Sequence, residues 1–149
     1  MPINTDEGIR ELLNSTKTIA LVGASTNPQR ASHAVMRYMM DRGYRVIPVN
    51  PNEPEICGQK AYASIKDIPE PIDMVDIFRR SEDTGPIMDE AIEIGAKSIW
   101  LQLNLFNEEG TKKAEAAGLK VVVDRCPAID MPRLGMGPPN PHKPKRAAA

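Results

Sequence analysis

The chain has 149 residues, of which 41% are hydrophobic and 26% are charged, and its formal net charge is −1. This length and composition are typical of a single globular domain. The balanced charge and an aromatic content of only 4% argue against nucleic-acid binding, and the charge gives no reason to expect an anionic membrane surface as partner.

The first residues contain neither a basic segment nor a long apolar run, and no apolar run in the chain approaches the ~20 residues that span a bilayer. Two cysteines, Cys57 and Cys126, are far apart in the sequence and form no CxxC pair. The sequence therefore predicts a cytoplasmic protein with two reduced thiols.

A short helix is predicted around Thr5–Asn14, before the first strand, and Asn4 and Glu7 have the spacing of a capping box at its start. The first strand is predicted at Thr18–Gly23. It is nearly continuous in apolar residues, as are most of the strand-like segments that follow. Such runs are typical of strands buried on both faces of a parallel sheet.

A helical period runs through residues 35–40, and Gly43 provides a stop after it. The second strand is predicted at Arg45–Val49. The connection that follows, Pro51–Asp73, is rich in Pro, Asn and Gly at its start. It predicts only a short helix near Ala63–Ile68.

The third strand is predicted at Met74–Phe78. A helix over residues 87–94 follows, with Pro86 suited to its first turn and Gly95 to its end. The fourth strand is predicted at Ser98–Leu103.

Asn107 followed by two glutamates predicts the capped start of a helix that ends at Gly118. The fifth strand is predicted at Leu119–Val123. The last segment, Gly135–Ala149, is basic and rich in proline, which predicts a flexible tail after a domain that covers residues 1–134.

Alternation of strands and helices predicts a single α/β domain with a Rossmann-like, doubly wound, five-stranded parallel sheet. Numbering the strands along the chain, we expect the order 3-2-1-4-5. In such sheets the ligand binds beyond the carboxyl ends of the strands, where the strand order reverses.

The turn after the first strand is therefore the first candidate site. Its glycine permits close backbone approach, its small polar residues and the following helix offer hydrogen-bond donors, and its arginine can pair with a phosphate. The alternative is an ordinary turn with a solvent-facing arginine. The turn consists of Gly23, Ala24, Ser25, Thr26, Asn27, Pro28, Gln29 and Arg30.

The turn does not carry the GxGxxG fingerprint of dinucleotide-binding proteins, because Ser25 stands at its second glycine. The second strand ends at Asn50, where an NAD-binding protein usually has an acidic residue for the ribose. Both departures argue against NAD. The missing negative charge suits a ligand with a phosphate on its ribose.

Two further strand ends carry candidate ligand contacts. Arg79 and Arg80 follow the third strand and are suited to phosphate oxygens, while Phe78 is suited to packing against an adenine or a pantetheine arm. The alternative is a core phenylalanine and two solvated arginines. Gln102, in the fourth strand, needs a partner, which is either backbone or ligand.

Catalytic and metal-binding patterns are scarce. His33 has no metal-ligand spacing around it and is interpreted as a structural or loop-facing side chain. Cys126 follows Arg125, which could lower the pKa of the thiol and make it reactive. No general base accompanies this cysteine, so the sequence predicts neither a catalytic residue nor a metal site.

Five strings of the sequence, in this order and spacing, resemble the small stand-alone CoA-binding domain proteins, the YccU-like family. That family is similar to the CoA-binding N-terminal domain of the succinyl-CoA synthetase alpha subunit. The strings are VGAS (22–25), PVNP (48–51), DMVDIFR (73–79), WLQL (100–103) and VVDRCPAIDMPRL (122–134).

The resemblance implies a Rossmann-like domain that holds coenzyme A and has no established enzymatic activity of its own. It implies that the CoA phosphates lie on residues 23–25 and Arg30, the adenosine near Asn50 and Pro51, and the rest of the cofactor along Phe78 and Arg79. The full candidate set is Gly23, Ala24, Ser25, Asn27, Pro28, Arg30, Asn50, Pro51, Phe78, Arg79 and Gln102.

Three functions follow as hypotheses. The first is a CoA or acyl-CoA carrier, sensor or regulator without catalysis. The second is an NAD(P)-linked oxidoreductase. The third is a CoA-binding subunit of a larger acyl-CoA enzyme, active only with a protein partner or a second copy of the chain.

Overall fold

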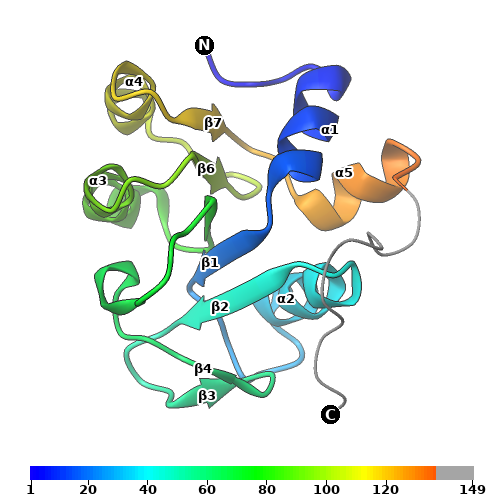
Figure 1. The fold of residues 1–149 in the computed structure, drawn as a ribbon, viewed down its shortest axis with the longest axis vertical. Coiled ribbons are helices and arrows are strands. Elements are labelled where there is room, and N and C mark those ends of the chain that lie inside the picture. Colours follow the sequence, from blue (N-terminus) through cyan, green and yellow to red (C-terminus); the bar gives the residue numbers. More distant parts are fainter. Residues whose placement is uncertain (137–149) are drawn as a thin grey trace.

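Five parallel strands form the central sheet of residues 1–136, the part of the chain that the computed structural model describes (Figure 1). All five predicted strands are present within one or two residues of their expected bounds, which confirms the Rossmann-like fold. The strands are β1 (Thr18–Val22), β2 (Arg45–Val49), β5 (Met74–Ile77), β6 (Ser98–Leu101) and β7 (Lys120–Val122).

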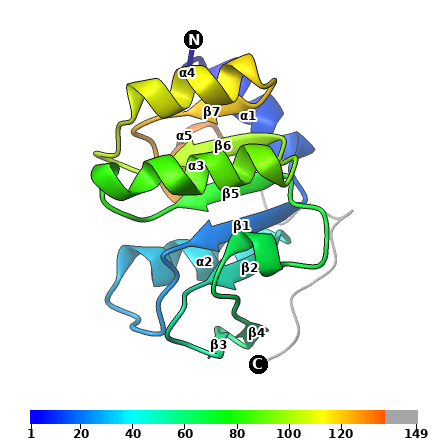
Figure 2. The same cartoon turned by 90° about the vertical axis from the view of Figure 1, so that its left-hand side faces the viewer.

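Helices cover both faces of the sheet (Figures 1 and 2). One face packs against α1 (Asp6–Ser15), α2 (Ala31–Asp41) and α5 (Pro127–Arg133), in a core with the fully buried Trp100. The other face packs against α3 (Thr84–Glu93) and α4 (Glu108–Ala116). Since both faces are covered, strand residues of either orientation are buried, which explains the continuous apolar runs.

The strand order differs from the expected one. The sheet runs β2-β1-β5-β6-β7, which is 2-1-3-4-5 in chain order, so the predicted order 3-2-1-4-5 is wrong. Pro48 gives the physical reason, because a proline in a central strand would leave a gap in the hydrogen-bond ladder. The strand that contains Pro48 lies at the sheet edge, and β5 pairs with β1 instead.

The connection between β2 and β5 covers that edge. It contains a small antiparallel hairpin, β3 (Glu55–Ile56) and β4 (Gln59–Lys60), that the sequence analysis did not predict. After the hairpin, Tyr62 forms an isolated parallel bridge with Val49 of β2, and its backbone N–H donates to the Pro48 carbonyl at 3.1 Å. The predicted short helix is present as a 3₁₀ turn, η1 (Ile65–Asp67).

The predicted helix cap is confirmed for α4 but is wrong for α1. Asn107 accepts a hydrogen bond from the Gly110 N–H at 2.8 Å and caps α4 as predicted. Thr5, rather than Asn4, caps α1, accepting from the Gly8 N–H at 3.1 Å. Helix α5 was not predicted, because its seven residues include two prolines and show little periodicity.

No helix within residues 1–136 is long and apolar enough to cross a membrane. The predicted tail begins at Gly135, and its residues 137–149 lie outside the described part of the chain.

Candidate functional site

The strand order reverses between β1 and β5, and a cavity of about 570 Å³ lies at the carboxyl ends of these strands. Gly23 follows β1 and has a φ of 89°, and Phe78 follows β5. A Cβ atom on Gly23 would lie 2.0 Å from the Phe78 carbonyl oxygen, so only glycine fits where these two strands come together. The cavity therefore lies at the topological switch point, where open α/β sheets bind ligands.

The loop between β1 and α2 is held by its own polar side chains. The Ser25 hydroxyl accepts from the Asn27 N–H at 3.0 Å, and the Asn27 side-chain oxygen accepts from the Gln29 N–H at 2.9 Å. Asn27 and Pro28 shape this loop but do not line the cavity, whereas residues 23–25 and Arg30 do. The loop thus presents its backbone and the start of α2 to the cavity.

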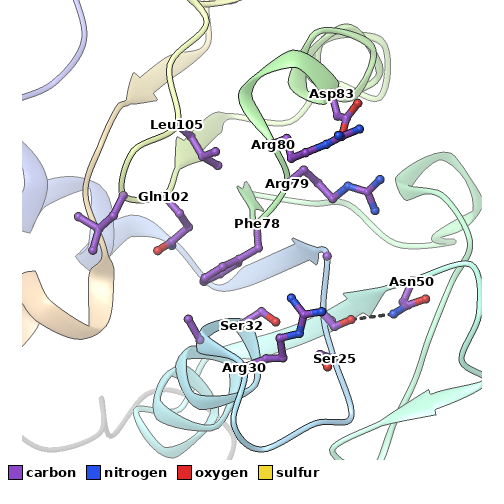
Figure 3. A pocket seen from close by; sticks show the side chains of 14 residues that line it. Ser25, Arg30, Ser32, Asn50, Phe78, Arg79, Arg80, Asp83, Gln102 and Leu105 are labelled. Carbon is purple, nitrogen blue, oxygen red and sulfur yellow. Dashed lines mark hydrogen bonds and ion pairs between the residues drawn. The ribbon is translucent and has the colours of Figure 1, made fainter.

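Asn50 ties the loop to the end of β2. Its side-chain N–H donates to the Ala24 carbonyl at 2.8 Å, and its side-chain oxygen accepts from the Asn52 N–H at 2.8 Å. Figure 3 shows the first of these bonds at one end of the cavity. Asn50 therefore braces the loop while lining the cavity, and Pro51, which follows it, does not line the cavity.

Three arginines give the cavity a positive charge. Arg80 pairs with Asp83 at 2.9 Å, while Arg30 and Arg79 form no ion pair with any carboxylate in residues 1–136. Arg30 extends from the start of α2, and Arg79 lies on the opposite side of the cavity (Figure 3). Two arginines without carboxylate partners, beside a helix N-terminus, are suited to bind a phosphate or pyrophosphate.

The other end of the cavity is apolar. Phe78 lies in the middle, with Leu105 and Gln102 beyond it and Asn50 and Arg79 on the opposite side (Figure 3). Leu103 also lines this end. The site therefore combines a cationic end with an apolar end, as an elongated ligand with a charged head and a less polar arm requires.

His33 supports the loop. Its Nδ1 lies 2.8 Å from the Ser25 carbonyl oxygen, and Arg37 Nε donates to its Nε2 at 3.1 Å. Because a carbonyl only accepts, Nδ1 carries the hydrogen and Nε2 is the acceptor. Cys57 Sγ contacts the same ring at 3.8 Å. The interpretation of His33 as a structural side chain agrees with these contacts.

Cys126 lies where its thiol is not activated. Its thiol is buried at the start of α5, and burial raises its pKa, with smaller contributions from the carboxylates of Asp76 and Asp130. Arg125 pairs with Asp130 at 3.5 Å and donates to the Asn4 carbonyl. The hypothesis of a thiol activated by Arg125 is therefore wrong, because burial keeps the thiol protonated.

Gln102 has a partner that the sequence analysis did not consider. Its side-chain N–H donates to Oδ1 of Asp76, in the middle of β5, at 2.7 Å. Both side chains are buried, and burial raises the pKa of Asp76 to about 7. An aspartate inside an apolar strand was a visible signal in the sequence, because such a residue needs a specific reason.

Eight of the eleven candidate residues line the cavity: Gly23, Ala24, Ser25, Arg30, Asn50, Phe78, Arg79 and Gln102. The cavity also includes Ser32, Asp83 and Leu105, which the sequence analysis did not single out. Ser32 could have been found from its position in the first turn of the helix after the loop. Asp83 and Leu105 follow strand ends but carry no distinctive local pattern. Within residues 1–136, no three His, Cys, Asp or Glu side chains cluster to hold a metal ion.

Comparison with known proteins gives a family match. The family model described as CoA binding domain matches residues 17–132, which include every candidate residue and the whole central sheet. The chain is 44% identical over 118 residues to the uncharacterized protein YneT of Bacillus subtilis, covering 79% of this chain and 87% of YneT. YneT is thus a relative of similar extent.

Larger relatives contain the same domain. The chain is 33% identical over 101 residues to the ADP-forming acetate–CoA ligase II of Archaeoglobus fulgidus, and the match covers 66% of this chain but only 15% of the ligase. Among solved structures, a hypothetical protein from Pyrococcus horikoshii superposes with a TM-score of 0.86 at 46% identity, covering 90% of this chain and 96% of that one.

Proposed function

The chain belongs to the CoA-binding domain family, and on that premise we propose that it binds coenzyme A or acyl-CoA in the cavity at the β1–β5 switch point. The observation that carries this proposal is that one cavity contains both an apolar region around Phe78 and two arginines, Arg30 and Arg79, that have no carboxylate partner among residues 1–136. CoA has a charged nucleotide head and a long, weakly charged pantetheine arm, so its two parts match the two ends of the cavity. Sensing, carrying or presenting CoA fits such a site.

The proposed orientation puts the phosphates at the loop of residues 23–25 and the start of α2. There the backbone N–H groups and the two arginines supply positive charge. The pantetheine arm then passes Phe78 toward Gln102 and Leu105. In this orientation Asn27, Pro28 and Pro51 act on the ligand through the shape of the loop and of the turn after β2.

The chain context adds two further proposals. We place the CoA-binding unit in residues 1–134 and the tail in residues 135–149. We also place the protein in the cytoplasm, where both cysteines stay reduced.

A second candidate function is that of a CoA-binding component acting with a partner protein. The exposed apolar side chains of Leu103, which lines the cavity, and Phe106, three residues further along the loop after β6, favour it.

Isothermal titration with CoA, and with NAD and NADP in parallel, tests the ligand. We expect CoA to bind with a Kd in the micromolar range or tighter and the two dinucleotides to bind far more weakly. An acidic residue for the ribose is missing at Asn50, and Ser25 replaces a glycine of the dinucleotide fingerprint. Binding of NAD or NADP without binding of CoA would overturn the proposal in favour of an oxidoreductase.

Arg30→Ala is expected to weaken CoA binding by about 1.5 kcal/mol or more, the contribution of a hydrogen bond to a charged group, while folding stability changes little because the side chain is exposed. Arg42→Ala is the matched control. Arg30 precedes α2 and Arg42 follows it, but Arg42 contacts Tyr38 instead of the cavity. Titration of both variants with CoA checks the prediction. Equal affinities for the two variants would remove Arg30 from the site.

A further inference from the structure

A buried polar pair lies directly behind the cavity. Asp76 is 1% exposed and lies in the central strand β5, between Leu21 of β1 and Trp100 of β6. Its Oδ1 accepts from Gln102, and its Oδ2 has no hydrogen-bond partner among the described residues. A buried carboxylate with one unsatisfied oxygen costs several kcal/mol in the ionised state, on the order of the penalty for an incompletely paired buried charge. Such a group is expected where function requires it.

Gln102 connects this pair to the cavity. Although it is only 5% exposed, it lines the apolar end of the cavity, beyond Phe78 (Figure 3). An ionised carboxylate can only accept hydrogen bonds, so Asp76 determines that the amide nitrogen of Gln102 points inward. The amide oxygen, Oε1, accepts no hydrogen bond from any residue in the 1–136 range and is not among the buried atoms that lack a partner. Oε1 is therefore the acceptor available to a ligand.

We propose that Asp76 is a positioning residue that orients Gln102, so that Gln102 Oε1 accepts a hydrogen bond from an amide N–H of the pantetheine arm. The inference rests on the proposed binding of CoA and deepens it. The arm carries two secondary amides, each with one N–H donor. With the phosphates at Arg30 and Arg79, the arm extends to the end of the cavity where Gln102 lies. Recognition at this end is thus specific for an amide-bearing arm.

Protonation of Asp76 reverses the orientation of the Gln102 side-chain amide. A protonated carboxyl group donates a hydrogen bond, so the Gln102 amide can turn and accept from it with Oε1, leaving only an N–H donor toward the cavity. Burial raises the pKa of Asp76 to about 7, which places this change near neutral pH. The amide N–H of the ligand then loses its acceptor, and affinity is lower at pH 6 than at pH 8.

Other ionisable side chains come from α5 and α2, which cover this face of the sheet. The Cys126 thiol, at the start of α5, lies close to Asp76 and has its pKa raised by burial. Asp130 of the same helix pairs with Arg125 and Arg133. His33 of α2 is held between the Ser25 carbonyl and Arg37. An Asp76 variant separates the contribution of Asp76 from all of these.

The test is titration with dephospho-CoA at pH 6, 7 and 8. This ligand has no 3′-phosphate monoester, whose second ionisation near pH 6 would add its own pH dependence. We expect the wild-type protein to bind about threefold to tenfold more tightly at pH 8 than at pH 6, the effect of one net hydrogen bond. Asp76→Asn and Gln102→Leu should each bind with an affinity that does not change over this range.

The same variants give a second readout. At pH 8, Gln102→Leu should bind about threefold to tenfold more weakly than wild type, and adding Asp76→Asn to it should weaken binding no further, because Asp76 acts through Gln102. Gln102→Met replaces Gln102→Leu if the leucine variant does not fold. A wild-type affinity independent of pH, or an unchanged pH profile in Asp76→Asn, overturns the role of Asp76. Absence of CoA binding at every pH overturns the proposed function itself.

Discussion

Between pH 5 and pH 8, the free energy of unfolding is expected to fall by about 2–3 kcal/mol more in the wild-type protein than in the Asp76→Asn variant. The ordinary pKa of an aspartate is 3.8, and burial raises that of Asp76 to about 7 in the folded protein. Between these values the folded protein keeps a proton that the unfolded chain has released. The free energy of unfolding therefore falls as the pH rises from about 4 to about 7. An asparagine has no proton to lose, so the variant lacks this contribution.

Urea denaturation at pH 5 and pH 8 measures the effect as a difference within each protein, which cancels any constant change in packing or hydrogen bonding. Asp67→Asn is the matched control, because it removes an exposed carboxylate, in η1, in place of a buried one. If Asp76→Asn loses as much stability as the control does between the two pH values, then Asp76 is already ionised at pH 5 and the burial argument fails.

Gly23→Ala is expected to destabilise the protein by about 3 kcal/mol or more, the combined cost of a left-handed backbone and a steric clash in a packed region. The new Cβ would lie 2.0 Å from the Phe78 carbonyl oxygen. That carbonyl belongs to the backbone that follows β5, so relief requires β1 and β5 to move apart at the switch point. CoA binding should be lost with it, since this movement displaces the loop from Phe78.

The Gly118→Ala variant separates the cost of the left-handed backbone from the cost of the steric clash. Gly118 has a φ of 93°, close to the 89° of Gly23, but a Cβ there would have no atom within 4 Å. This control carries the backbone cost alone, about 1 kcal/mol. Denaturant unfolding of both variants checks the prediction. Equal losses in the two would mean that the contact between Gly23 and Phe78 relaxes at little cost.

The buried pair and the switch point explain why parts of the site could be predicted and others not. The turn after β1 follows a strand and precedes a helix, so its role depends on residues close in sequence. Four of its six candidate residues line the cavity: Gly23, Ala24, Ser25 and Arg30. Asn27, Pro28 and Pro51 are equally local, yet they do not line the cavity. Whether a loop residue lines a cavity depends on the path of the loop, which composition does not specify.

Interactions between distant segments were harder to predict. Gln102 and Asp76 are 26 positions apart and meet because β5 and β6 are neighbours. The predicted strand order was wrong because it did not take account of Pro48, a residue that favours an edge strand. Arg79 and Arg80 are adjacent in sequence, yet only Arg80 has a carboxylate partner, Asp83, and that difference depends on the 3₁₀ turn η2 (Ser81–Asp83).

By itself, the sequence determined the alternation of strands and helices, the burial of both sheet faces, the cap at Asn107 and the glycine turn at Gly23. These follow from periodicity and backbone preference within a few residues. The tertiary structure alone decided which strands are neighbours, which arginines keep a free charge, and that Asp76 orients Gln102 behind the cavity. These depend on burial and on partners brought together by folding, because the energy of a polar group is set by its surroundings rather than by its neighbours in the chain.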